Sequence, residues 1–358
     1  MKHVLKTCCV FLVLIAMCTA FIGCEPTDEL QATINPSSKV EPSGTIKFTW
    51  SRSGLKEEAA ADAFIAAFNE KYPDVEVTPD YNPGNIAARI ASGEIGDVFH
   101  FNETDAYNYA VTQKTLLPLN QYIDPLDVDT SKVYTGILAL GNVEGQLYMV
   151  PQDYNHVVMI YNKTALTEAG LAAPEDGWTW EDFKSYCQKL TLKNPNDANL
   201  YSQVGGYLNY SWEPVYISFL EGWGGKWYDT EEKKITLTDE KVLQGIKELL
   251  TFANEGCIKP EGKGDMSAYT GLTDVNFVFR TMVYPNITSY GKTYDDLDLE
   301  WDVVSFPALP THKVGTGASG FGVYKYTKNP DAAAALALFF FNEAGQEAVH
   351  GTTGGSVP

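Results

Sequence analysis

Several residue types are scarce in this chain, and each scarcity argues against a class of function. There are 26 cationic side chains against 46 carboxylates, which gives a formal net charge of -20. A surface of that sign repels nucleic acid and anionic lipid, so we expect neither as a direct partner. Arginine occurs only at Arg52, Arg89 and Arg280, which leaves little capacity for two-pronged binding of phosphates or dicarboxylates.

Cysteine and histidine are too few or too scattered to predict a metal site. Of the six cysteines, only Cys187 and Cys257 lie beyond the first 24 residues. They either fill two separate apolar positions, which we favour, or pair as a disulfide outside the cytoplasm. The histidines lack metal-ligand spacing, and the sequence contains no nucleophile elbow or phosphate loop. We therefore expect neither a metal nor a cofactor.

Aromatic residues, in contrast, are abundant. They make up 13% of the chain, with 21 tyrosines and 7 tryptophans. The C–H faces of sugars pack on such rings, while sugar hydroxyls need polar side chains as partners. This composition favours a neutral polyhydroxylated ligand. Arg52 and Arg280 leave an acidic sugar open, and the excess of carboxylates leaves a polyamine open.

The N-terminus carries an export signal. Lys2 and Lys6 precede an apolar run from Cys8 to Ala20, which is too short for a spanning helix and predicts a signal peptide over residues 1–23. Gly23-Cys24 resembles a bacterial lipobox, which implies that Cys24 is lipidated, although Phe21 replaces the usual leucine. The alternatives are an ordinary signal peptide cut nearby and an uncleaved anchor. Residues 24–44 lack periodicity and are typical of a flexible tether.

Residues 45–358 are too many for one simple core, and two lobes are expected. Strand and helix patterns alternate from residue 45 to residue 101, which is typical of βαβ units and a mostly parallel sheet. Ligands bind beyond the carboxyl ends of such strands. The polar loops at those ends contain Arg52 and the segment Asn102–Asp105, and both are predicted to face a ligand.

A short polar segment joins two apolar strands near the middle of the chain. The first strand ends at Pro151, and the second runs from Val157 to Tyr161. Asp153 and Asn155 lie between them and are candidate ligand contacts. A second polar or glycine-rich crossing is expected at residues 317–320, and the two together predict a hinge.

The order of motifs around this crossing resembles a known family. Pro151, the polar crossing, Tyr161-Asn162-Lys163, a short helix ending Ala169-Gly170-Leu171 and Trp180-Glu181-Asp182-Phe183 are similar to the interlobe segment of extracellular solute-binding proteins of ABC importers. The likeness is to the carbohydrate-uptake type, which includes maltodextrin-binding proteins. It implies an α/β, two-lobed periplasmic-binding-protein-like fold with parallel-rich sheets.

The resemblance also implies lobe boundaries. The first lobe is expected to comprise residues 45–152 and 321–350, and the second residues 153–320 and 351–358. Family members usually continue with further helices beyond the Gly-Ser-Val-Pro-like element that ends at Pro358. The sequence therefore looks like a fragment that lacks the last helices of the second lobe.

Three further segments carry implied ligand contacts. Gly96-Asp97-Val98 is similar to the family's Pro-Asp-Val element, Glu213-Pro214 to its second-lobe Glu-Pro, and the run from Phe277 to Asn286 to its strand before a cleft aromatic. The implied contacts are Phe101, Asn102, Glu103, Asp105, Trp212, Glu213, Tyr216, Trp223, Tyr284, Asn286 and Tyr290. The alternative for the first four is that Phe101 belongs to the core and the others to a solvated loop.

Two function classes follow. The resemblance implies a monomeric, lipid-anchored extracytoplasmic protein that captures a sugar or oligosaccharide and delivers it to an ABC permease. The alternative is a secreted carbohydrate-active enzyme in which carboxylates such as Glu213 or Asp153 form an acid and nucleophile pair. Incubation with oligosaccharides separates the two classes, because a binding protein returns them intact.

Overall fold

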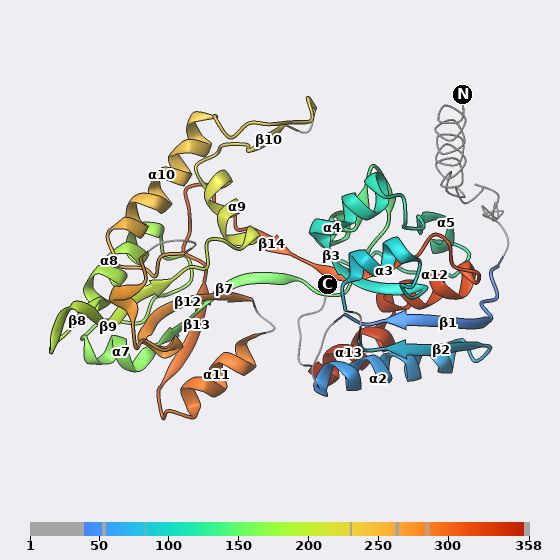
Figure 1. The fold of residues 1–358 in the computed structure, drawn as a ribbon, viewed down its shortest axis with the longest axis horizontal. Helices are drawn as coiled ribbons and strands as arrows, with labels where there is room; N and C mark the ends of the chain where they lie inside the picture. The colour runs from blue at the N-terminus through green and yellow to red at the C-terminus, as the bar shows by residue number, and fades with distance from the viewer. Residues whose placement is uncertain are drawn as a thin grey trace, which may run out of the picture. The chain divides into compact units, whose positions relative to one another are not determined.

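The computed structural model contains two large β-sheets with helices packed around them (Figure 1). The residues that it describes are 39–51, 55–82, 84–229, 231–261, 265–283 and 286–353. The predicted signal peptide, the predicted lipidation site Cys24, and the ligand candidates Arg52 and Tyr284 lie outside the described residues. Among the helices in those ranges, none combines the length and the apolar character needed to cross a membrane.

The first sheet has the strand order β2-β1-β3-β15-β6. Its strands are β1 (Gly44–Thr49), β2 (Val75–Asp80), β3 (Val98–Asn102), β6 (Val150–Pro151) and β15 (Ser319–Val323). β1 pairs in parallel with β2 and β3, and α2 (Leu55–Lys71) and α3 (Ile86–Ser92) form the connections. The predicted βαβ units are therefore confirmed. β15 lies antiparallel between β3 and β6.

The remaining elements around the first sheet are mostly short. They are α4 (Glu103–Tyr107), the π-helical turn η1 (Asn108–Thr112), α5 (Asn120–Ile123), α6 (Thr135–Leu140), β4 (Asn142–Val143), β5 (Gln146–Leu147), α12 (Pro330–Leu338), η5 (Phe339–Phe341) and α13 (Glu343–Thr353). Phe321 of β15 packs against Phe48 and Phe64 at ring distances of 5.4 and 5.8 Å. Residues 332–338 of α12 are all buried, as their uninterrupted apolar run predicts.

The second sheet has the order β13-β7-β12-β9-β8, and β14 pairs with β7. Its strands are β7 (Asn155–Asn162), β8 (Leu192–Asn194), β9 (Asp197–Tyr207), β12 (Phe277–Val283), β13 (Trp301–Ser305) and β14 (Thr316–Gly317). Only β9 and β12 pair in parallel, so this sheet is mainly antiparallel where a parallel-rich one is expected. The reason is that β7 enters from the first sheet and runs against both of its neighbours, β12 and β13.

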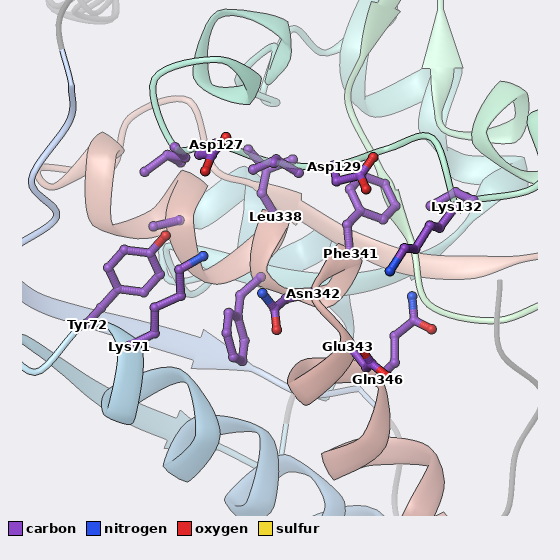
Figure 2. A pocket seen from close by; sticks show the side chains of 15 residues that line it. Lys71, Tyr72, Asp127, Asp129, Lys132, Leu338, Phe341, Asn342, Glu343 and Gln346 are labelled. Atoms are coloured by element: carbon purple, nitrogen blue, oxygen red, sulfur yellow. The ribbon is translucent and has the colours of Figure 1, made fainter.

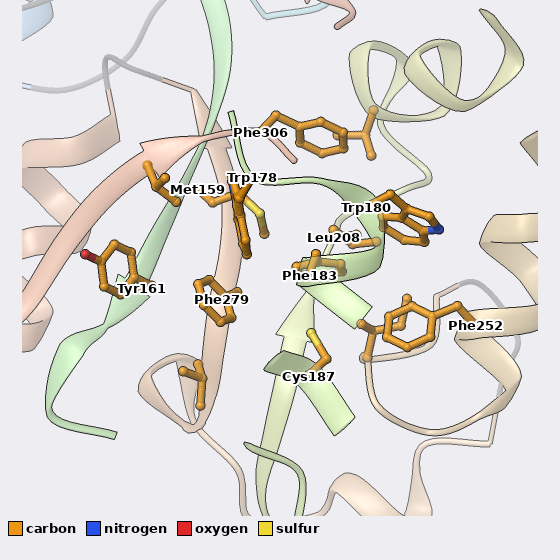
Figure 3. Close-up of a cluster of buried hydrophobic side chains, with 14 of the residues drawn as sticks. Met159, Tyr161, Trp178, Trp180, Phe183, Cys187, Leu208, Phe252, Phe279 and Phe306 are labelled. Atoms are coloured by element: carbon orange, nitrogen blue, oxygen red, sulfur yellow. The ribbon is translucent and has the colours of Figure 1, made fainter. Parts of the chain in front are cut away.

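Helices, short helical turns and a two-stranded hairpin surround the second sheet. They are α7 (Lys163–Glu168), α8 (Trp180–Leu190), α9 (Glu213–Gly222), β10 (Tyr228–Asp229), β11 (Lys234–Ile235), α10 (Glu240–Asn254), η2 (Ser267–Tyr269), η3 (Asp274–Asn276) and α11 (Ile287–Asp295). Figure 3 shows the core between α8 and the sheet, where Trp178, Phe183 and Phe279 meet edge to face or tilted. Burial of such large rings supplies much of the stability of this half of the molecule.

Two local predictions can be checked directly. A threonine directly before the helix that Trp180–Phe183 open predicts an N-cap, and Thr179 does cap α8: its hydroxyl accepts from the backbone N–H of Asp182, while the Asp182 carboxylate accepts from the Thr179 N–H. The helical spacing of Val242, Ile246, Leu249 and Leu250 predicts that all four face the core, and for Leu250 this prediction is wrong, since 49% of it is exposed. The buried face of α10 instead uses Gly245, which brings the helix close to α9. Cys187 is buried, and both it and Cys257 are free thiols.

Candidate functional site

Two segments connect the sheets, and they lie side by side. β6 leads into β7, and β14 leads into β15, with β14 paired to β7 and β15 paired to β6. Asp153, in the first segment, is 1% exposed. Its Oδ1 accepts a hydrogen bond from the backbone N–H of Ser319 at 2.7 Å, and its Oδ2 accepts one from the Ser319 hydroxyl at 3.0 Å. The side-chain amide of Asn155 donates a third hydrogen bond to Asp153, at 3.2 Å.

The carboxyl ends of the central strands face these connecting segments. In the first sheet, Asn102 at the end of β3 lies opposite Ser319. In the second, Val283 at the end of β12 lies opposite Val157, near the start of β7. Each sheet therefore presents its carboxyl edge to the crossing. That is the edge at which open α/β sheets bind ligands.

Carboxylates gather at this edge. Glu103 begins α4; its backbone N–H donates to the Ala318 carbonyl at 3.1 Å, and its side chain lies beside Gly317. Burial, together with repulsion from Glu213 and Asp153, raises the pKa of Glu103 to about 7. Glu103 is therefore partly protonated near neutral pH, and it can donate a hydrogen bond as well as accept one.

Glu213 is held in place through the start of α9. Burial raises the pKa of the Glu213 carboxyl. The Ser218 hydroxyl donates to the Pro214 carbonyl at 2.7 Å and accepts from the Gly315 N–H at 2.7 Å. A side chain at Gly315 would collide with the Pro214 backbone, so α9 packs directly on the chain that leads into β14. The result is a fixed position for Glu213 beside the crossing.

A pocket of about 180 Å³ lies at the carboxyl ends of β9 and β12. It is lined by Tyr207, Asn209, Trp212, Arg280, Thr281, Met282, Val283, Asn286 and Tyr290. We call it the β9–β12 pocket. Asn209 has φ of 47°, a left-handed conformation that is uncommon for residues other than glycine and often marks functional sites. Trp212 immediately precedes α9, so the pocket extends to the start of that helix.

The structure separates the predicted ligand residues into groups. Trp212, Asn286 and Tyr290 share the β9–β12 pocket. Tyr216 is 38% exposed and lies near Glu213. Burial raises the pKa of Tyr216, and the negative charge of Glu213 raises it further. Asn102 is exposed at the edge of the first sheet.

Asp105 follows Asn102 on the same edge, in α4, and burial raises its pKa.

Two predicted ligand residues lie elsewhere. Phe101 is 4% exposed and packs against Phe99 and Tyr109 at ring distances of 5.4 and 5.5 Å, which places it in the core. Trp223 follows the last turn of α9 and stacks on Phe219. It lines a separate pocket with Trp180 and does not reach the β9–β12 pocket.

Sequence reasoning missed Tyr207 and Asn209, and it named Arg280 without assigning it to the site. One signal for Asn209 is its position two residues after the end of the long strand β9. For Arg280 the signal is a lone charge in an apolar strand, since Val278 and Met282, two residues away on either side, are both buried. Among the described residues no group of three metal-ligating side chains occurs.

A larger hollow of about 460 Å³ lies among the helices and loops that pack around the first sheet (Figure 2). Its lining includes Lys71 and Tyr72 at the end of α2, Asp129 and Lys132 in the loop before α6, and Asn342 after η5. Because α2 ends where β2 begins, the hollow lies near the amino ends of the strands. None of the predicted ligand residues that the structure describes lines it.

Comparison with known sequences agrees with this architecture. Residues 52–347 match the model of the family described as bacterial extracellular solute-binding protein. An arabinooligosaccharide-binding protein of Bacillus subtilis is 25% identical over 58% of this chain and 48% of its own length. A multiple sugar-binding protein of Streptococcus mutans is 23% identical over 81% of this chain and 69% of its own length. The chain thus spans about half the length of the Bacillus relative.

Solved structures share the fold. An ABC substrate-binding protein of Listeria monocytogenes in complex with cycloalternan superposes with a TM-score of 0.70 at 20% identity, over 88% of this chain and 80% of that one. The sugar-binding protein MalE of Xanthomonas citri gives 0.68 at 17% identity, over 88% and 79%. These likenesses confirm the two-lobed α/β fold class. Since the family model matches most of its length, the chain belongs to the bacterial extracellular solute-binding protein family.

Proposed function

We propose that this chain is the sugar-capturing component of an ABC importer. In this role it binds a sugar or oligosaccharide outside the cytoplasm and delivers it to the permease subunits. The names of the Bacillus and Streptococcus relatives support a saccharide ligand. The Listeria neighbour in complex with cycloalternan supports the same ligand class.

The β9–β12 pocket is the observation that carries this proposal. It combines the rings of Tyr207, Trp212 and Tyr290 with the side-chain amides of Asn209 and Asn286. Rings pack on the C–H face of a sugar, and amides both donate to and accept from its hydroxyls. The pocket also occupies the edge of the sheet where α/β proteins bind ligands.

The proposed mechanism of capture is closure about the crossing. We assign residues 45–152 and 319–353 to one lobe, because β15 lies in the first sheet and α13 packs on α2, and residues 153–318 to the other. Glu103 then belongs to the first lobe, and Glu213 to the second. A ligand that contacts both lobes favours the closed form by its additional contacts there. The two connecting segments are short, so a few backbone torsions can absorb the motion.

The tether and the membrane anchor remain sequence-based parts of the proposal. If Cys24 is lipidated, residues 24–44 would link the folded body to the cell membrane near its permease. Cys24→Ala should then release the protein from the membrane fraction into the medium or periplasm. An unchanged distribution would remove the lipoprotein interpretation and leave the sugar-binding proposal in place.

Calorimetric titration with arabinotriose, mannotriose and maltotriose tests the central claim. At least one should bind. Trp212→Ala and Glu213→Gln should each weaken that binding about tenfold, because ring packing and hydroxyl bonding each contribute on the order of 1 kcal/mol or more. Trp227→Ala is the matched control, since Trp227 precedes β10 and does not line the pocket. Equal losses in the control would show that the effects are structural.

The same samples distinguish a binding protein from a carbohydrate-active enzyme. The relatives are named as binding proteins, which supports binding over catalysis. Chromatography after prolonged incubation should recover each trisaccharide intact. Cleavage that disappears in Glu213→Gln would favour the enzyme instead, and the absence of binding by any saccharide would contradict the proposed function.

A further inference from the structure

Arg280 is a charged residue at the base of the β9–β12 pocket, and it is held rigidly. Its side chain is 12% exposed. One terminal nitrogen, Nη2, donates to the Tyr290 hydroxyl at 3.0 Å, and the other, Nη1, is ion-paired with Asp274. The guanidinium carbon also lies 4.5 Å from the centre of the Tyr290 ring and 5.1 Å from that of Tyr207.

These contacts fix the orientation of the guanidinium before any ligand arrives. A free arginine side chain loses considerable rotational freedom when it binds a ligand, whereas one already packed between rings loses little. Guanidinium carries five N–H donors, and the bond to Tyr290 and the pair with Asp274 use only some of them, while Arg280 lines the pocket. Arg280 is thus a preorganised donor for ligand oxygen atoms.

The charges around the pocket are balanced. Arg280 faces the carboxylate of Asp274, and the second cation, Lys259, lies 4.3 Å from the centre of the Tyr207 ring. A second carboxylate, Glu261, accepts from the Ser211 N–H. Burial is the main cause of the raised pKa of Tyr207, and the negative charge of Glu261 is the second. Among the described residues, these two cations are matched by these two carboxylates, so the four together provide no net positive charge to attract an anion.

We propose that Arg280 is a specificity-determining residue that binds the hydroxyl oxygens of an uncharged sugar unit, and that Asp274 sets this preference by cancelling the charge of Arg280. The inference rests on the proposed function, which supplies a saccharide as the ligand. The pocket, at about 180 Å³, is smaller than the roughly 300–1,000 Å³ of sites for drug-sized ligands, which suits one sugar unit.

The alternative is an acidic sugar whose carboxylate pairs with Arg280. Such a carboxylate would compete with Asp274 for the guanidinium and would enter a site that also contains Glu261. Like charges that are brought together in an interface repel each other strongly, which selects against such a ligand. Asp274 therefore distinguishes the two possibilities, because its removal frees the charge of Arg280 without disturbing the sugar-binding rings.

The experiment titrates neutral and anionic trisaccharides into the full chain and three variants. The probes are arabinotriose and maltotriose on one side and trigalacturonate on the other. The unaltered chain should bind a neutral probe in preference. Arg280→Lys should weaken neutral binding about tenfold, because lysine lacks the planar set of donors. Asp274→Asn should shift the preference about tenfold toward trigalacturonate. Melting temperatures report whether each variant folds.

Asp296→Asn is the matched control, because it removes the same charge from the exposed pair with Lys292 on α11. It should leave the preference unchanged. Tighter binding of trigalacturonate to the unaltered chain would overturn the inference while supporting the proposed function. A shift in Asp274→Asn no larger than in Asp296→Asn would also overturn it. If no saccharide of either kind binds, both the inference and the proposed function fail.

Discussion

Asp153 holds Ser319 through both of that residue's donors, across 166 positions of sequence. The bond to the Ser319 backbone N–H and the bond to its hydroxyl join the two segments that connect the sheets. Since Asp153 is almost fully buried, water does not compete with these bonds. The geometry favours a role for Asp153 in fixing the crossing, where the sequence alone suggested direct contact with a ligand.

Removing this clamp should therefore cost stability. We expect Asp153→Ala to lower the free energy of unfolding by about 1–3 kcal/mol, because the Ser319 N–H loses its partner in a buried site. Asp129→Ala is the control, since Asp129 accepts the same two kinds of bond from Ser131, at 2.9 and 2.6 Å, in an exposed turn. It should cost clearly less than Asp153→Ala in the same urea titration, because its partners can bond to water instead.

Glu103 should make stability depend on pH near neutrality. Its pKa in the folded chain is about 7, above the usual glutamate value of 4.5, so the folded state binds more protons than the unfolded state between these values. Stability should consequently fall as the pH rises from about 5 to 7. Thermal melts across this range should show a shallower decline in Glu103→Gln, which keeps the shape of the side chain but cannot ionise.

Other carboxylates also titrate in this range, so a matched control is needed. Glu70→Gln removes an exposed carboxylate from α2 and should leave the slope of the pH profile in place. If Glu103→Gln and Glu70→Gln change the profile equally, the burial of Glu103 does not govern it. A higher melting temperature of Glu103→Gln above pH 7 would further support the assignment.

The order of local motifs predicted most of the first sheet. Alternation between β1 and β3 placed strands and helices correctly, and the apolar run of α12 predicted its burial. The second sheet was harder to predict. The apolar pattern of β7 indicates a buried strand, but it does not say whether that strand pairs in parallel or antiparallel with its neighbours. The pairing of β7 with β12 is antiparallel, and Met282 lies opposite Val158. This direction depends on the side from which the chain enters the second sheet. Periodicity carries no such information.

The candidate site was predictable where residues are close in sequence. Trp212 and Glu213 lie at the start of α9, and the structure brings Trp212 together with Asn286 and Tyr290. The sequence analysis grouped Trp223 with Trp212. The ten residues of α9 lie between the two, which separates them by about 15 Å along the helix. The pairing of Arg280 with Asp274 and Tyr290 could not be predicted, because it depends on the tertiary placement of η3 and α11.

Gly245 should be intolerant of a side chain. A Cβ at this position would collide with the carbonyl oxygen of Phe219, so α10 would have to move away from α9. We expect Gly245→Ala to lower the free energy of unfolding by about 1–3 kcal/mol. Gly136→Ala in α6 is the control, because no atom lies within 4 Å of the added group. It should be neutral or stabilising by up to about 1 kcal/mol, measured by urea unfolding.

The last prediction concerns Tyr107, which is 55% exposed in α4 and lies four residues after Glu103, on the same face of that helix. An exposed ring on the carboxyl edge of the first sheet is well placed to pack on a sugar held from the opposite lobe by Trp212. Tyr107→Ala should therefore weaken trisaccharide binding about five- to tenfold, in line with the energy of ring packing. Tyr134→Ala removes a ring that is 67% exposed at the start of α6, and it should leave affinity unchanged. Calorimetric titration of both variants, with melting temperatures to show that neither loses its fold, decides the matter. Equal affinities for Tyr107→Ala and Tyr134→Ala would show that α4 contributes no ring to the ligand.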